Sequence, residues 1–528
     1  MTLHGFDLIN EREIAELKTT ARLYRHARTG AQLLSLANDD ENKTFGITFR
    51  TPPSDATGVA HILEHGVLNG SRKYPVKEPF TQMVKGSLRT FINAMTFPDK
   101  TAYPVASQNL QDFYNLVDVY FDAVFHPLIP PEVLAQEGWH YELTDVNAPL
   151  AYKGVVFNEM KGAYSSPDGA LYHYSRQSLF PDNAYGVDSG GDPKHIPDLT
   201  HEQYVNFHRA YYHPSNALIW FYGDDDPAER LRRTNAVLAE FDARPIHATV
   251  ALQPRFPSPR RFTFPYDASA DDKARGMVAV NWMLDEYYDA ESLMTLDILS
   301  YLLLGTQASP LRKALIDSGL GEEVAGGGLQ SSLRQMTFAA GLKGIDVANA
   351  DKVEAVIMQT LDALHRDGFD PELVEAALNT VEFWLRENNT GAFPRGLSLM
   401  FRALTTWLYD RDPLDLLAFE SPLQAVKQRI AAGEPIFTEL IRAQLLDNTH
   451  RVSVVVIPDP TLRAREDAAE RETLDRVRAA LSADELNALV VRTRELKKMQ
   501  ETPDSPEALA TLPMLKVSDL DQRNKPIP

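Results

Sequence analysis

Strand-like and helix-like patterns alternate along most of this chain, and this alternation restricts its fold more than any other feature. Residues 31–37 and 45–50 have the pattern of two strands with turn residues between them, and 217–222 that of a buried strand. Apolar residues recur at helical spacing over 113–125, which predicts an amphipathic helix packed on a core. The sequence therefore predicts a fold of class α+β.

One proline-rich segment divides the alternation into two parts. Four prolines lie within residues 253–265, and such a cluster favours a domain boundary. We expect a first domain over 1–255 and a second over 256–460. Sequence similarity does not relate the two parts, so only the order of elements suggests a repeat. The elements expected in the second part are strands at 277–283 and 451–457 and helices at 291–304, 351–367 and 371–386.

The last part of the chain, 461–528, differs in composition from the rest. Between residues 461 and 500, 17 of 40 residues are charged, with leucine and valine at helical spacing and a helix start expected at Ser482. This pattern predicts a charged helical hairpin that lies on a surface or bridges two lobes. The proline-rich tail over 501–528 is typical of a linker.

Composition excludes several classes of function. The chain has no cysteine, so a metal site can use only His, Asp or Glu. The formal net charge of −20 argues against nucleic acid as a partner and weakly favours cationic ligands.

Targeting signals are equally sparse. The acidic N-terminus resembles neither a secretory signal nor a transit peptide, and no apolar stretch is long enough to span a membrane. We expect a bacterial-type cytoplasmic protein without a membrane partner. A processed protein of an organellar matrix is the alternative.

The pentapeptide H-I-L-E-H is the most informative short motif. On a helix, His61 and His65 stand at i and i+4 and project from one face, so one ion can bind both. Glu64 can reach a water at that ion without being a ligand. We expect Asp55 or Thr57 to cap the start of the helix. The alternative is a surface helix that has two histidines by chance.

A site with two histidines needs a third protein ligand. Glu159 lies in the mostly apolar segment 154–162, where an isolated acid needs a partner, and this favours it. An acid beside an exposed helix start explains the same pattern equally well, so the residues alone leave the choice open. The downstream candidates are Glu78, Glu132, Glu137, Glu142 and Glu159.

Further stretches extend the pattern over essentially the whole chain: 86–101, 158–162, 189–193, 212–216, 309–321 and 389–396. With these stretches and the H-x-x-E-H order, the chain resembles the pitrilysin/insulinase family of zinc metallopeptidases, and within it the presequence protease branch. The resemblance implies two related domains, each a mixed, mainly antiparallel sheet packed with helices, followed by the helical hairpin.

The resemblance also implies the roles of individual residues. Zn²⁺ would be held by His61, His65 and Glu159, with Glu64 as the general base that takes a proton from water. In the family, the peptide substrate adds as a strand to an exposed sheet edge, which here corresponds to Asn93, Ala94 and Met95. A turn or strand-end role is the alternative for Asn93.

The implied function is a zinc endopeptidase, or its catalytic half, that hydrolyses unfolded peptides of a few tens of residues, including targeting-type or basic peptides. Members of the branch are typically twice this length, and their second half supplies an Arg and a Tyr that contact the substrate. We therefore expect either that second half, in cis or in trans, or a homodimer mate as a partner. The alternative function is a non-catalytic peptide-binding or scaffold subunit paired with another chain. Such subunits usually lack part of the zinc motif, which is complete here.

Overall fold

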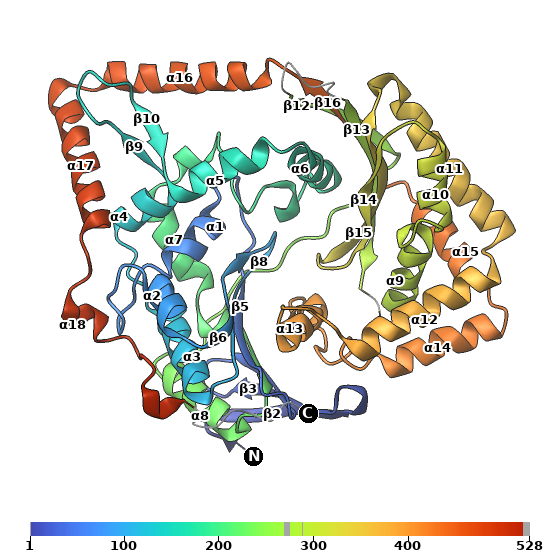
Figure 1. Ribbon diagram of the computed structural model, residues 1–528, viewed down its shortest axis with the longest axis horizontal. Coiled ribbons are helices and arrows are strands. Elements are labelled where there is room, and N and C mark those ends of the chain that lie inside the picture. Colours follow the sequence, from blue (N-terminus) through green and yellow to red (C-terminus); the bar gives the residue numbers. More distant parts are fainter. Residues whose placement is uncertain (1, 269–274, 288, 521–528) are drawn as a thin grey trace.

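The computed structural model describes residues 2–268, 275–287 and 289–520, which form two lobes, each built on one sheet (Figure 1). The strands of the first lobe are β1 Thr2–Leu3, β2 Phe6–Ile14, β3 Thr19–His26, β4 Gln32–Ala37, β5 Lys43–Arg50, β6 Arg89–Ile92, β7 Met95–Thr96, β8 Lys100–Ser107 and β11 Ala217–Gly223. Their order is β1-β2-β3-β4-β11-β5-β8-β6, with β7 also paired to β8. Only β4 and β11 run parallel among the described strand pairs of this sheet.

The second lobe contains a smaller sheet of the same mixed kind. Its strands are β12 Arg260–Asp267, β13 Gly276–Glu286, β14 Glu323–Gln330, β15 Gln335–Ile345 and β16 Arg451–Asp459. They are ordered β12-β16-β13-β15-β14, and β12 is parallel to β16 while the other pairs are antiparallel. A separate hairpin joins β9 His140–Glu142 to β10 Ala151–Lys153. The expected mixed, mainly antiparallel sheets are confirmed.

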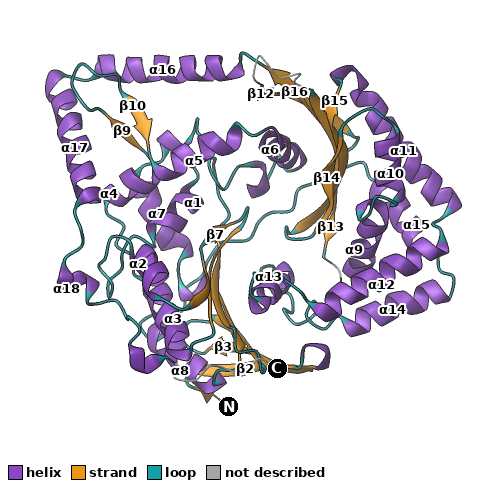
Figure 2. Ribbon diagram, in the orientation of Figure 1, coloured by secondary structure: helices purple, strands orange, loops and turns teal. Residues whose placement is uncertain are grey.

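Helices cover the sheets and surround them (Figure 2). Those that precede residue 255 are α1 Val59–Gly66, α2 Pro79–Gly86, α3 Leu110–Phe125, α4 Pro131–Val133, α5 Val155–Tyr164, α6 Pro167–Leu179, α7 His201–Tyr211 and α8 Pro227–Leu238. Those that follow are α9 Ala290–Leu304, α10 Pro310–Asp317, α11 Ala350–Asp367, α12 Pro371–Glu387, α13 Arg395–Trp407, α14 Glu420–Ala431, α15 Ile436–Leu440, α16 Leu462–Ala480, α17 Ala483–Glu501 and α18 Pro506–Leu509. Every strand and helix that the periodicity predicted is present, with ends shifted by a few residues.

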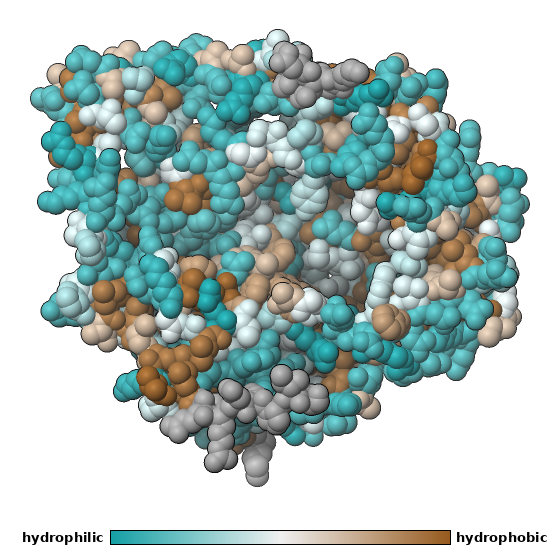
Figure 3. All heavy atoms as spheres, viewed as in Figure 1, coloured by the Kyte–Doolittle hydropathy of each residue, from teal (hydrophilic) through white to brown (hydrophobic). Residues whose placement is uncertain are grey.

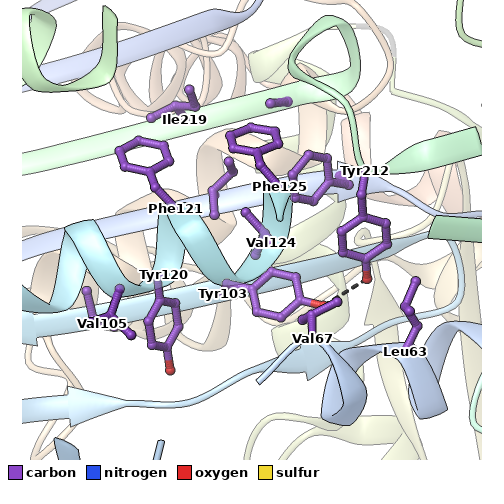
Figure 4. Packing of buried hydrophobic residues seen from close by; sticks show 14 of the residues in the cluster. Leu63, Val67, Tyr103, Val105, Tyr120, Phe121, Val124, Phe125, Tyr212 and Ile219 are labelled. Atoms are coloured by element: carbon purple, nitrogen blue, oxygen red, sulfur yellow. Dashed lines mark hydrogen bonds between the residues drawn. The ribbon is translucent and has the colours of Figure 1, made fainter. Parts of the chain in front are cut away.

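The main core of the first lobe lies between its sheet and helix α3, whose apolar stripe faces β5. The rings of Phe45 and Phe121 pack edge to face with centroids 4.9 Å apart, and Val124 is fully buried beside them. Leu63 and Val67, at the end of α1, extend this core toward the paired hydroxyls of Tyr103 and Tyr212 (Figure 4). The motif helix is therefore anchored in the largest core of the molecule.

The two lobes exchange helices. Helix α13 follows residue 255 in sequence but packs on the first sheet, where Met400 and Trp407 are buried against Trp220 and other residues of β4 and β11. Helix α6 precedes residue 255 but packs on the second sheet, where Leu171 is buried with Val454. Figure 2 shows both helices between the two sheets. The division at residue 255 stays a proposal, and helices cross it in both directions.

The charged C-terminal helices brace the first lobe from outside. Ser482 caps α17 in a capping box with Glu485, as the sequence predicted. The two helices of the expected hairpin meet at a corner (Figure 1), and Leu474 of α16 is buried against Leu143 beside β9. The tail then follows α2 and α3, where the side chains of Asn109 and Asn115 bind its backbone. Residues 521–528 of the predicted linker lie outside the described part.

The exposed face of the molecule in Figure 3 is mostly hydrophilic, in keeping with the many acidic residues. Among the described helices, none combines the length and the apolar character that a membrane crossing requires.

Candidate metal centre

Helix α1 begins at a glycine. Gly58 is the N-cap residue with φ +69°, in the left-handed region that favours glycine, and no side chain caps the helix. The expected cap by Asp55 or Thr57 is wrong, because the Asp55 carboxylate instead accepts hydrogen bonds from the backbone and hydroxyl of Thr57. A Cβ on Gly58 would lie 2.7 Å from the carbonyl oxygen of Gly190 and 2.8 Å from the Cα of Gly191. Glycine thus allows a turn distant in sequence to reach the start of the motif helix.

That turn orients the first histidine. The Nδ1 of His61 lies 3.1 Å from the backbone carbonyl oxygen of Gly190. A carbonyl only accepts, so Nδ1 carries the proton and the Nε2 lone pair is left free to bind a metal ion. The side chain of His61 is 12% exposed, so its ring is held in place by its surroundings.

A buried carboxylate orients the second histidine in the same way. Glu137 accepts a hydrogen bond of 3.2 Å from Nδ1 of His65, and Asn69 and Gln136 donate to its other oxygen. This arrangement again leaves Nε2 as the free ring nitrogen, and carboxylates commonly hold metal-binding histidines in this manner. Glu137, one of the five candidate ligands, therefore supports a histidine.

The electrostatic surroundings of His65 favour a positive charge. Burial alone would lower the pKa of His65, but the hydrogen bond to Glu137 and the charges of Glu64 and Glu159 outweigh it, so the pKa is raised. Burial would raise the pKa of Glu137, yet its hydrogen bonds with His65 and Gln136 lower it. Carboxylates thus gather where a cation would bind.

Glu159 completes the cluster from helix α5. Its Oε2 lies 3.8 Å from Nε2 of His61 and 4.0 Å from Nε2 of His65. These three residues form the one group of potential ligands within the described ranges whose ligand atoms lie within 4.8 Å of one another. The other four candidate carboxylates lie outside this group. Two imidazole nitrogens and one carboxylate oxygen fit zinc, which binds such sets and keeps a further position open.

Glu64 lies beneath the cluster on the same helix. It is 8% exposed, and within the described residues its carboxylate takes part in no hydrogen bond. Its charge contributes to the raised pKa values of His65, Tyr103 and Tyr120, which places its carboxylate close to both the cluster and the core. A buried carboxylate with free acceptor positions suits a base that receives a proton from water.

The predicted substrate strand lies beside the motif helix. Asn93 and Ala94 connect β6 to β7, which begins at Met95, at the edge of the nine-stranded sheet. Asn93 is exposed and pairs through its backbone with Pro104, whereas Thr96 lies against the backbone oxygen of Ala60 in α1. The edge therefore runs next to the cluster, although the peptide-binding role of these residues stays a prediction.

Sequence reasoning missed the groups that support the ligands. Glu137 was considered only as a ligand, and its place in a short π-helical turn at Leu134–Gly138 has no simple sequence signal. The glycines at 58, 190 and 191 were the available signal, because clustered glycines often mark close backbone approaches.

Three family signatures match the chain. They are "Insulinase (Peptidase family M16)" over residues 50–164, "Peptidase M16 inactive domain" over 198–381 and, over 456–528, the region associated with subfamily C of the M16 peptidases.

Curated relatives match along almost the whole chain. A chloroplastic/mitochondrial presequence protease 1 of Arabidopsis thaliana is 51% identical over 99% of this chain and 49% of its own length. Protein HypA of Clostridium perfringens is 41% identical over 99% and 54%, and a mitochondrial presequence protease of Xenopus laevis 36% over 98% and 51%. The chain thus spans about half the length of the curated relatives it matches.

Solved structures share the fold at low sequence identity. The first half of the periplasmic protease PqqL from Escherichia coli superposes with a TM-score of 0.60 at 15% identity, covering 94% of this chain and 98% of that one. A putative M16-like peptidase from Alicyclobacillus acidocaldarius gives 0.59 at 16% identity, covering 84% and 99%.

Proposed function

Because the chain belongs to the presequence protease branch of the pitrilysin/insulinase (M16) family, we propose that it is a zinc endopeptidase, or the catalytic half of one, acting on unfolded peptides. The observation that supports this most directly is the convergence of His61, His65 and Glu159 beside the buried carboxylate of Glu64. A non-catalytic scaffold would not need all four side chains in this arrangement.

Zinc would be held by Nε2 of both histidines and the carboxylate of Glu159. When bound, zinc supplies a Lewis acid that polarises a carbonyl group and lowers the pKa of water. Glu137 and the Gly190 carbonyl fix the ring orientations, so the ligand atoms are arranged before the ion arrives.

Glu64 would act as general base. Its carboxylate accepts the proton of the attacking water and delivers it to the amine that leaves. Its burial limits competing solvent contacts, and it needs no other partner to be displaced before it can accept a proton.

The exposed sheet edge would bind the peptide. An extended peptide paired with the backbone near Asn93, Ala94 and Met95 would lie beside α1 and the cluster. Backbone pairing does not distinguish side chains, so we expect broad sequence tolerance. Targeting-type or basic peptides of a few tens of residues fit the net charge of −20, and the named relatives are presequence proteases.

A second half, or a second copy of the chain, is the partner that we propose, because the relatives are about twice as long. For the compartment, the bacterial-type cytoplasm stays our prediction. The names of the plant and animal relatives favour the organellar matrix, the alternative.

The test is zinc content and peptide cleavage of the purified chain. We expect one zinc per chain, lost in a variant with both His61→Ala and His65→Ala, and cleavage of unfolded peptides that requires zinc. Stoichiometric zinc in the double variant would contradict the ligand assignment. Zinc binding without any cleavage, even when a second half from a relative is added, would favour the scaffold alternative.

A further inference from the structure

A second carboxylate network, centred on Asp188, lies behind the metal cluster. Asp188 precedes the glycine turn that contacts His61, and its side chain is 15% exposed. Its Oδ1 accepts hydrogen bonds from the backbone N–H of Gly190 at 2.9 Å and from Arg176 at 3.3 Å. Its Oδ2 accepts from the hydroxyl of Tyr164 at 3.2 Å and lies 3.2 Å from Nδ1 of His173.

Each of these four groups lies on an element that leads to the metal cluster or to the other lobe. Tyr164 is the last residue of α5, the helix that contains Glu159. His173 and Arg176 lie on α6, which packs on the sheet of the second lobe. Gly190 presents its carbonyl oxygen to His61.

The contact between the turn and α5 is close. A Cβ on Gly190 would lie 3.0 Å from the Cε of Met160, the residue that follows Glu159. Asp188 therefore joins two segments that already touch, one behind each of two proposed ligands. A change in the position of the turn would move the acceptor of His61, and a change at the end of α5 would move Glu159.

The charge of Asp188 is well stabilised. Burial would raise its pKa, but the hydrogen bond from His173 and the charge of Arg176 outweigh this and lower the pKa to about 2. The carboxylate thus stays an acceptor for all four donors over the pH range in which histidines can bind a metal ion.

We propose that Asp188 is a positioning residue of the metal centre, which holds the turn behind His61 and the end of the helix that contains Glu159 in one fixed arrangement. The inference rests on the proposed zinc site. It adds a residue that touches neither the ion nor a ligand, and it connects the cluster to the second lobe through α6. Removal of supporting groups around metal ligands typically weakens metal binding by about 10–100-fold.

The experiment compares three variants by zinc affinity, measured through competition with a chelator. Tyr164→Phe removes only the link to α5, and we expect a loss of about threefold. Asp188→Asn can still accept from Gly190 but cannot accept with both oxygens, and we expect about 10-fold. Asp188→Ala removes every link, and we expect approximately 100-fold. Visible absorption of the Co²⁺-loaded proteins should change in the same order, because it reports on the geometry of the ligands.

A matched control separates positioning from general stability. Glu382 is similarly buried, at 21% exposure, and pairs with Arg386 and Lys427 in the second lobe. Glu382→Gln should lower the thermal unfolding temperature to a degree comparable with Asp188→Asn while leaving zinc affinity and the Co²⁺ spectrum unchanged.

Several results would overturn the inference. Wild-type zinc affinity in folded Asp188→Asn and Asp188→Ala would overturn it while the zinc site itself stands. An equal loss of affinity in Glu382→Gln would show that stability alone explains the effect. If Asp188→Ala does not fold, the Asn and Tyr164→Phe variants decide. Absence of zinc binding in the wild-type protein would overturn the proposed function as well, so the two failures are distinguishable.

Discussion

Two glutamates near the cluster have the same chemistry but different surroundings. Glu159 is half exposed and points its oxygen at both histidines, whereas Glu64 is buried beside them. We predict that Glu64→Gln keeps zinc and loses cleavage by several orders of magnitude, because an amide cannot accept the proton of water. Glu159→Gln should instead weaken zinc binding. Metal analysis of both variants beside a cleavage assay checks this, and equal loss of zinc in both would mean that the roles are confused.

Gly58 is a second residue whose effect can be isolated. Gly58→Ala adds a methyl group 2.7 Å from the Gly190 oxygen at a positive φ, so we expect a loss of unfolding free energy and of the contact with His61. Gly30 has φ +77° and a Cβ there would meet nothing within 4 Å, so Gly30→Ala measures backbone strain alone. That strain should cost about 1–2 kcal/mol.

The difference between these variants gives the cost of the collision. Chemical denaturation should show at least twice the loss for Gly58→Ala, and zinc affinity should decrease only in that variant. Equal effects of the two substitutions would show that the turn can move away freely.

At the scale of elements, helix α7 supplies a pH-dependent contribution to stability. His208 donates to the backbone oxygen of Val124 at the end of α3. Burial lowers the pKa of His208 to about 4, and the nearby Arg244 and Arg209 act in the same direction. An unfolded histidine titrates near 6.5, so on acidification the unfolded chain binds the proton first. This contribution is therefore complete above about pH 6.5 and decreases as the pH falls toward 4.

The expected size of this effect can be measured. Between pH 7 and pH 5, His208 accounts for a loss of about 2 kcal/mol in the free energy of unfolding. His208→Gln keeps a donor for Val124 without the titration, so its stability should fall less over the same range. His247→Gln, at an exposed position, is the control and should retain the full pH dependence. An unchanged pH profile in His208→Gln would contradict the argument.

At the scale of the molecule, the exchange of α6 and α13 makes each lobe depend on the other. A fragment of residues 1–255 would lose α13 and expose Trp220 and the other apolar residues of the inner sheet face. We predict that this fragment aggregates or fails to give a cooperative thermal transition, whereas residues 1–460 fold. The 1–460 fragment should unfold at a lower temperature than the full chain, because α16 and α17 cover the cluster around Leu143. A well-folded 1–255 fragment would show that the lobes are independent.

Completeness of the catalytic site is the second question at this scale. We predict that the 528-residue chain folds and binds zinc but cleaves peptides poorly, since nothing in the described part of the chain opposes the peptide on the exposed sheet edge. Each absent stabilising donor typically costs about 10²–10³ in rate. Addition of a second half in trans should restore activity, with α16 and α17 in the contact.

Steady-state assays with and without the second half, together with a sizing measurement, check this expectation. Full activity of a monomer would contradict it. Full activity of a homodimer would show that a second copy supplies the missing wall.

The sequence alone determined the local features of this protein. The strands at β5 and β11, the helix α3 and the capping box of α17 follow from periodicity and end signals, since neighbouring residues decide them. The i, i+4 spacing of His61 and His65 likewise needs nothing beyond one helix. Glu159 was selected by resemblance, because a ligand distant in sequence leaves no local pattern.

Only the tertiary structure decided which distant residues meet. Gly190 comes to lie against Gly58 and His61, and Glu137 against His65, through close backbone packing that periodicity does not encode. The same holds for α6 and α13, whose apolar stripes fit either sheet equally well by pattern. Hydrophobic burial is non-directional, so an amphipathic helix specifies that one face must be covered, while the shapes of the assembled sheets select what covers it.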